Sequence, residues 1–128
     1  MSTQLEIGPI LHSSLIVADA SRALEFYRDI LGLAPDDSRP DLGYPGAWLN
    51  VGGGQIHLLE LPNPDPTVGR PAHGGRDRHT ALAVNDMDLL QARLERAGLE
   101  FTRSKSGRKA LFTRDPDGNA LEFIETRQ

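Results

Sequence analysis

The chain has 128 residues, 38% of them hydrophobic and 25% charged, a net charge of −4 and no cysteine. This usage is typical of one folded domain, and the acidic balance with scattered arginines predicts no nucleic-acid partner. Because cysteine is absent, disulfides and thiolate chemistry are excluded, and a metal would need nitrogen and oxygen ligands. The chain shows no leader-like start and no apolar run of about 20 residues, so we expect a cytoplasmic protein with no membrane partner.

The first part of the chain predicts a strand, a helix and three more strands. Apolar residues alternate with smaller or polar ones over 12–17, which indicates a strand with two different faces. Asp19 can cap the amphipathic helix that follows, and Gly32 can end it. A weakly marked strand is expected near 34–38. The segments GAWLNV and QIHLLEL, either side of a triple-glycine turn, are typical of two antiparallel strands.

The second part repeats this order after a proline-rich linker, residues 62–77. A strand over 79–84 leads to a helix between Asp86 and Gly98, and a faint strand is expected near 100–103. RKALFTR, a DPDG turn and NALEFIE complete the repeat. We therefore predict one α+β domain over residues 1–128, made of two tandem βαβββ modules at about 8–62 and about 77–126.

Aligning the two modules brings four potential metal ligands into register. His12 aligns with His79, and matching the final turns places His57 over Glu122. Strand alternation directs all four side chains to the face that the helices do not cover. One histidine in a half-buried strand is more often structural than a ligand, but the set of four is far more specific than any member. His73 lies in the linker, has no counterpart in the repeat and is expected to be exposed.

A doubled βαβββ unit with ligands on its first and last strands resembles the vicinal oxygen chelate superfamily. This superfamily contains glyoxalase I, fosfomycin- and bleomycin-resistance proteins, methylmalonyl-CoA epimerase and extradiol dioxygenases. The motifs that carry the resemblance are VADASRALEFYRDILGL, GRDRHTALAV and DPDGNALEFIE. The resemblance implies a curved eight-stranded mixed sheet around a metal cleft, either within one chain or shared across a homodimer. It also implies metal ligands at His12, His57, His79 and Glu122.

Such a site would hold one divalent metal, Zn, Ni, Co, Fe or Mn, because the set offers imidazole and carboxylate but no sulfur. The metal would stabilise an enolate or oxyanion of a small substrate that chelates through vicinal oxygens. Glyoxalase I enzymes usually carry Glu or Gln where this chain has His57, which leaves Glu122 as the expected catalytic base. Further candidates for substrate contact are Trp48, Arg78, Arg108, Phe112 and Arg114.

The leading interpretation is a metal-dependent lyase or isomerase of glyoxalase type, and several alternatives stay open. His12, His79 and Glu122 could serve an extradiol-type dioxygenase as its iron triad, with His57 donating a hydrogen bond from outside. A drug- or toxin-binding resistance protein would keep the fold, although such members lack the metal ligands. Four protein ligands could also close a structural zinc site.

Overall fold

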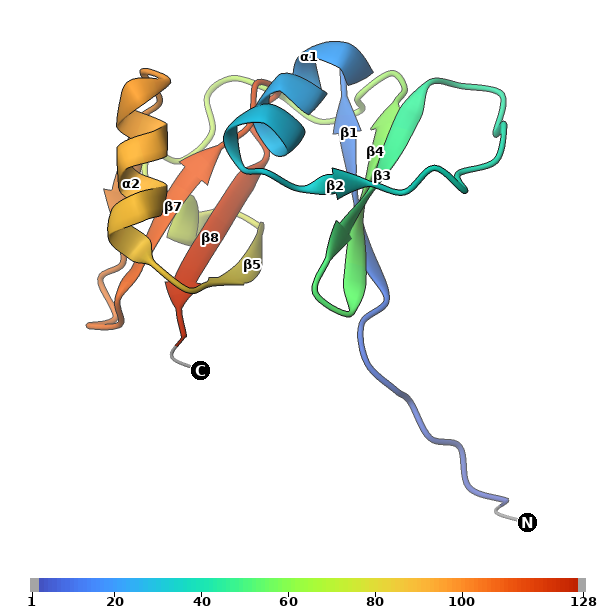
Figure 1. Ribbon diagram of the computed structural model, residues 1–128, viewed down its shortest axis with the longest axis horizontal. Coiled ribbons are helices and arrows are strands. Elements are labelled where there is room, and N and C mark those ends of the chain that lie inside the picture. Colours follow the sequence, from blue (N-terminus) through green and yellow to red (C-terminus); the bar gives the residue numbers. More distant parts are fainter. Residues whose placement is uncertain (1–2, 127–128) are drawn as a thin grey trace.

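The computed structural model describes residues 3–126 as two modules with the same order of elements (Figure 1). The first module contains β1 (His12–Val17), α1 (Ala20–Leu24), η1 (Glu25–Ile30), β2 (Ala34–Pro35), β3 (Gly46–Val51) and β4 (Gly54–Glu60). The linker contains one short helix, η2 (Gly74–Arg76). The second module contains β5 (His79–Val84), α2 (Met87–Arg96), β6 (Phe101–Arg103), β7 (Ala110–Arg114) and β8 (Ala120–Glu125). The predicted α+β class with two βαβββ modules is confirmed.

The eight strands form two four-stranded mixed sheets, ordered β1-β4-β3-β2 and β5-β8-β7-β6. In each sheet the first strand runs parallel to the last strand of its module, and the hairpin pairs are antiparallel. The eight-stranded mixed sheet that the resemblance implies is thus present as two sheets of four strands. Strands β1 and β5 pair with β4 and β8 of their own modules, and they meet each other through a side-chain hydrogen bond between Ser13 Oγ and Thr80 Oγ1 at 3.0 Å.

The helix boundaries follow from the predicted caps. Asp19 accepts a hydrogen bond from the amide of Arg22 at 3.1 Å, and Asp86 accepts one from Leu89 at 3.0 Å. Gly98 ends the second helix with a φ of 71°, a conformation that glycine adopts without strain. The first helix widens after one turn into the π-helical η1, whereas α2 remains α-helical over 10 residues. No helix within residues 3–126 has the length and apolar character needed to cross a bilayer.

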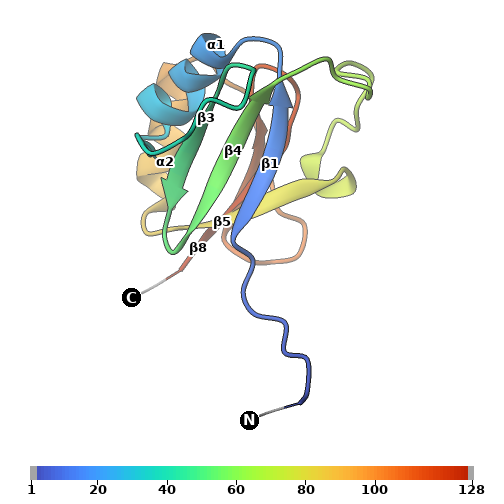
Figure 2. The same cartoon turned by 90° about the vertical axis from the view of Figure 1, so that its right-hand side faces the viewer.

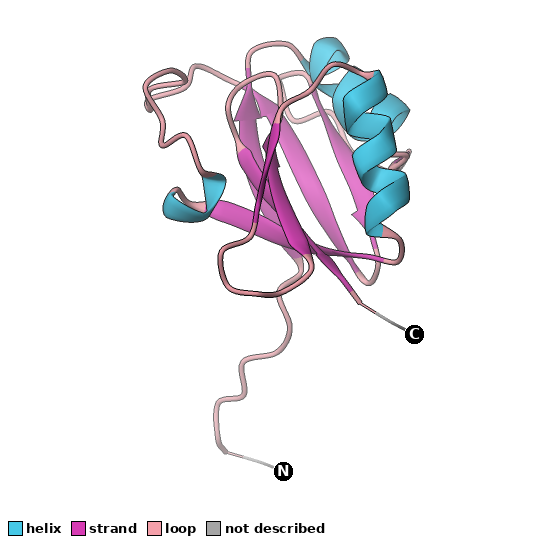
Figure 3. Cartoon of the chain, turned by 90° about the vertical axis from the view of Figure 1, so that its left-hand side faces the viewer, coloured by secondary structure: helices cyan, strands magenta, loops and turns pink. Residues whose placement is uncertain are grey.

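Both modules contribute to one hydrophobic core, which lies on the helix-covered faces of the two sheets. Figures 2 and 3 show α1 and α2 on the same side of the molecule, with the strands of the two sheets beside them. The buried Tyr27 of η1 donates a hydrogen bond to Asp115 Oδ2 in the second module, at 2.7 Å. The opposite faces of the sheets are therefore left to carry the polar residues of the repeat.

Candidate functional site

The strand register places the four predicted ligands in two equivalent pairs. On β4, His57 stands opposite Ser14, two residues beyond His12 on β1. On β8, Glu122 stands opposite Ala81, two residues beyond His79 on β5. The alignment of His57 with Glu122 that the repeat predicts is thus the alignment that the sheets have.

The equivalence extends to one aromatic residue in each module. Trp48 pairs with His57 across β3 and β4, and Phe112 pairs with Glu122 across β7 and β8. We call His12, His57 and Trp48 half-site 1, and His79, Glu122 and Phe112 half-site 2. Each half-site therefore offers two potential ligands and one apolar wall on a single sheet face.

In half-site 1, the His57 ring is held between two other rings. It stacks on His12 with centroids 3.9 Å apart and on Trp48 with centroids 4.5 Å apart. His12 itself is exposed, and His57 and Trp48 are half-buried. Burial and the neighbouring His12 imidazole lower the pKa of His57, which favours the neutral ring that a metal requires.

A hydrogen-bond chain fixes which nitrogen of His57 carries the proton. The Gln55 amide nitrogen donates to Asp36 Oδ2 at 2.8 Å and to Asn50 Oδ1 at 3.0 Å, so the Gln55 oxygen is left as an acceptor. His57 Nε2 lies 2.8 Å from that oxygen and must donate to it. Nδ1 of His57 then keeps its lone pair. Nothing in the sequence pattern singled out Gln55 and Asp36 for this role.

In half-site 2, Glu122 is a buried carboxylate with cationic and aromatic neighbours. Its side chain is 4% exposed, with Oε1 3.2 Å from His79 Nε2 and Oε2 3.3 Å from an Arg108 guanidinium nitrogen. The His79 ring packs edge-on against Phe112, with centroids 5.1 Å apart. Arg108, a predicted substrate contact, therefore lies beside the predicted base.

The contacts of His79 direct its second ring nitrogen at Glu122. His79 Nδ1 donates to the carbonyl oxygen of Asp77 at 2.9 Å, so in the neutral ring Nε2 has a lone pair that points at a carboxylate oxygen. A ring nitrogen and a carboxylate oxygen 3.2 Å apart can both bind one divalent metal ion. A backbone carbonyl on the second nitrogen is also the usual support of a metal-bound histidine. The half-site thus fits a divalent metal.

The two half-sites do not come together within one chain. They lie on separate sheets, and no group of three or more His, Asp or Glu residues within 3–126 is placed to hold a metal ion. A complete four-ligand site would need residues from a second source.

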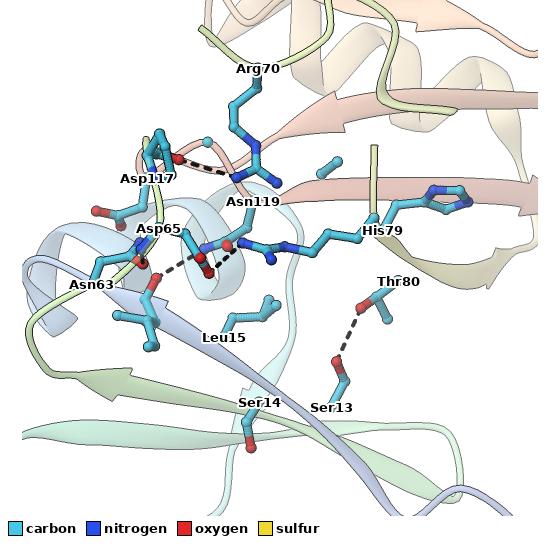
Figure 4. Close-up of a pocket in the computed structure, with 15 residues that line it drawn as sticks. Ser13, Ser14, Leu15, Asn63, Asp65, Arg70, His79, Thr80, Asp117 and Asn119 are labelled. Carbon is cyan, nitrogen blue, oxygen red and sulfur yellow. Dashed lines mark hydrogen bonds and ion pairs between the residues drawn. The ribbon is translucent and has the colours of Figure 1, made fainter. Parts of the chain in front are cut away.

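Two other predicted substrate contacts have intrachain partners. Arg78 pairs with Asp65 at 2.7 Å, and Arg114 donates to Asp77 Oδ2 at 2.8 Å and to the carbonyl oxygens of Gly118 and Pro71. Arg78 borders a cavity of about 290 Å³ at the junction of the modules (Figure 4). Both arginines of its wall are paired with carboxylates, Arg78 with Asp65 and Arg70 with Asp77.

The structure places His73 differently from the sequence-based expectation of an exposed linker residue. His73 is half-buried, its Nδ1 lies 2.7 Å from Thr102 Oγ1, and its ring packs edge-on against Phe112 with centroids 4.8 Å apart. The linker can approach so closely because Gly74 has no side chain. A Cβ there would lie 3.2 Å from Phe112 Cβ. The linker composition predicted exposure instead, and no local signal in the sequence indicated this packing.

The chain belongs to the Glyoxalase/Bleomycin resistance protein/Dioxygenase superfamily, whose family model matches residues 9–123. It is 32% identical to the lactoylglutathione lyase of Haemophilus influenzae, over 92% of this chain and 93% of that protein. It is 29% identical to Glyoxylase I 4 of Arabidopsis thaliana, over 93% of this chain and 71% of that protein.

Solved structures share the fold. A lactoylglutathione lyase from Agrobacterium tumefaciens superposes with a TM-score of 0.65 at 25% identity, over 93% of this chain and 94% of that one. The fosfomycin resistance protein FosX from Listeria monocytogenes superposes with a TM-score of 0.73 at 18% identity, over 94% and 93%, and that structure contains Mn(II). A divalent metal thus occurs in a protein that shares this fold.

Proposed function

We propose that this chain is a metal-dependent lyase or isomerase of glyoxalase type. Its metal would be held by His12 and His57 of one chain together with His79 and Glu122 of a second copy. The observation that carries the proposal is the equivalence of the two half-sites, each with two potential ligands at the same register. A two-fold dimer would contain two such sites, because each chain would give one half to each.

The bound metal would supply charge stabilisation for vicinal oxygens of the substrate as an enolate or oxyanion develops. Glu122 is buried and would move the proton as the base. Arg108 is the candidate for an anionic group of the substrate, since it reaches the same carboxylate from an exposed loop. Trp48 and Phe112 would form apolar walls that exclude water from the reacting atoms.

Because relatives carry the name lactoylglutathione lyase, the first substrate to test is the hemithioacetal of glutathione and an α-ketoaldehyde. Turnover that requires metal and is lost in Glu122→Gln would support the proposal. Metal-dependent oxygen uptake with a catechol, in place of this turnover, would favour a dioxygenase.

A subunit-mixing experiment tests the shared site directly. His12→Ala and His79→Ala each damage both sites of their own homodimer, so each variant alone is expected to lose stoichiometric metal. Re-formed mixed dimers would contain one intact site. The mixture should therefore regain about a quarter of the wild-type metal content, since about half of the dimers are mixed.

His73→Ala is the matched control and should keep its metal, because His73 lies outside both ligand pairs. No recovery on mixing would refute the shared site. Untagged wild-type protein that binds no metal after reconstitution would refute the metal-dependent function as a whole.

A further inference from the structure

The N-terminal segment 3–11 leaves the body of the molecule as an extended arm (Figure 1). Four of its side chains are large, apolar and highly exposed: Leu5 at 88%, Ile7 at 91%, Ile10 at 87% and Leu11 at 71%. Other exposed large apolar residues, such as Leu42 and Val68, occur singly along the chain. A concentrated apolar surface of this kind marks an interaction site, whereas single exposed residues do not.

The base of the arm is fixed to the first sheet. The carbonyl oxygen of Leu11 accepts a hydrogen bond from the amide of Gln55 at 3.0 Å, so the strand pairing of β1 and β4 extends into the arm. From there the arm points away from β7 and β8 (Figure 1). Its apolar side chains therefore cannot lie on the second module of their own chain.

We propose that the arm binds the second module of a second copy of this chain. This inference rests on the proposed shared site, because His12 directly follows the arm and would stand beside the partner's half-site 2. At about 3.3 Å per residue, Ile7 lies within about 17 Å of His12 along an extended chain. The arm would thus hold half-site 1 against the opposite half-site.

A suitable receiving surface adjoins half-site 2. A groove of about 830 Å³ lies between the linker and strands β6 and β7, and Phe112 forms part of its wall while also packing on His79. Its apolar lining consists of Pro71, Ala72, Leu99, Phe101 and Phe112. The groove therefore adjoins the half-site that His12 of a partner would face, and its lining matches the apolar character of the arm.

The first test measures the dimer dissociation constant by sedimentation. The double variant Leu5→Ser/Ile7→Ser should raise it at least about tenfold, because two arms per dimer each lose two buried apolar side chains. Val68→Ser is the matched control, since Val68 is 80% exposed and lies outside the arm, and it should leave the constant unchanged. An unchanged constant in the arm variant would overturn the proposal, as would a wild-type chain that is monomeric.

The second test uses the absence of cysteine from the chain. Ile7→Cys and Ala72→Cys proteins are mixed, allowed to exchange subunits and treated with a short bismaleimide. The proposal predicts an Ile7→Cys to Ala72→Cys cross-link, and none when Leu42→Cys replaces Ala72→Cys. Equal yields in both mixtures, or none in either, would refute the groove.

The outcomes separate this inference from the proposed function. Arm variants that weaken a wild-type dimer with no metal would support the arm and refute the metal enzyme. A metal-loaded dimer whose dissociation constant does not change in the arm variants would support the metal enzyme and refute the arm.

Discussion

The hydrogen bond between Tyr27 and Asp115 joins the two modules and gives a quantitative prediction. Tyr27 is fully buried, and its hydroxyl lies 2.7 Å from Asp115 Oδ2. Tyr27→Phe keeps the ring and removes only this donor, so no large cavity forms. A hydrogen bond to a charged group contributes about 1.5–3 kcal/mol, and we expect the free energy of unfolding to fall by about 2 kcal/mol.

In a domain of this size, that loss lowers the melting temperature by about 5–10 °C. Urea unfolding at one fixed protein concentration would measure it, because dimerisation makes apparent stability depend on concentration. Tyr44→Phe is the control, since the only other tyrosine is half-buried and its ring lies near the Arg39 guanidinium, a contact that phenylalanine preserves. A loss below about 0.5 kcal/mol in Tyr27→Phe would refute the assigned role.

The stability lost in Tyr27→Phe should depend on pH, because the hydrogen bond is made to the titratable carboxyl of Asp115. Burial raises the pKa of Asp115, while hydrogen bonds from Asn119 and Tyr27 oppose the increase. A carboxyl with a raised folded-state pKa adds stability below its unfolded pKa, and this is lost as pH rises through the folded value. Removing the Tyr27 donor raises the pKa of Asp115 further. The stability difference between Tyr27→Phe and wild type should therefore be largest near neutral pH and shrink in acid.

Two further predictions concern the linker. The Arg70 guanidinium holds the pKa of Asp77 well below its usual range, so its stabilising effect is present at neutral pH and is lost as pH falls through the folded pKa. Asp77→Asn should lower the urea midpoint at pH 7 and flatten its decline in acid, and equal slopes in both proteins would contradict this. Gly74→Ala should cost about 1–3 kcal/mol, because the added Cβ meets Phe112 at 3.2 Å. Gly53→Ala is the control, because a Cβ added at Gly53 meets open space, and it should unfold in urea like wild type. If Gly74→Ala also unfolds like wild type, the close approach to Phe112 does not contribute to stability.

The repeat could be predicted from the sequence because helix caps and strand alternation are local patterns. Asp19 and Asp86 cap helices through their own next turn, and strand alternation has a period of two wherever a sheet is half covered. The second strand was weakly marked in the sequence and expected near residues 34–38. The strand β2 is correspondingly short and contains only two residues. Pro35 has no amide hydrogen to donate to the sheet, and the contact with β3 continues only through the amide of Asp36, which donates to the Trp48 carbonyl oxygen at 2.7 Å.

The position of His73 could not be predicted from the sequence. Its position depends on the packing of Gly74 against Phe112, 38 residues further along the chain, and no local pattern reports such a contact. The same holds for Gln55, whose amide fixes the proton on His57 only because Asp36 and Asn50 are near it in space.

The sequence by itself determined the two modules, the faces of their strands and the equivalent positions of His57 and Glu122 in the repeat. These features follow from local periodicity and from the repeat. Only the tertiary structure decided how the modules are placed relative to each other. Each half-site lies on the sheet of its own module, and packing of both helices into one core holds the two sheets so that the four ligands do not gather within residues 3–126 of one chain. That placement depends on contacts such as Tyr27 to Asp115, which join distant parts of the chain.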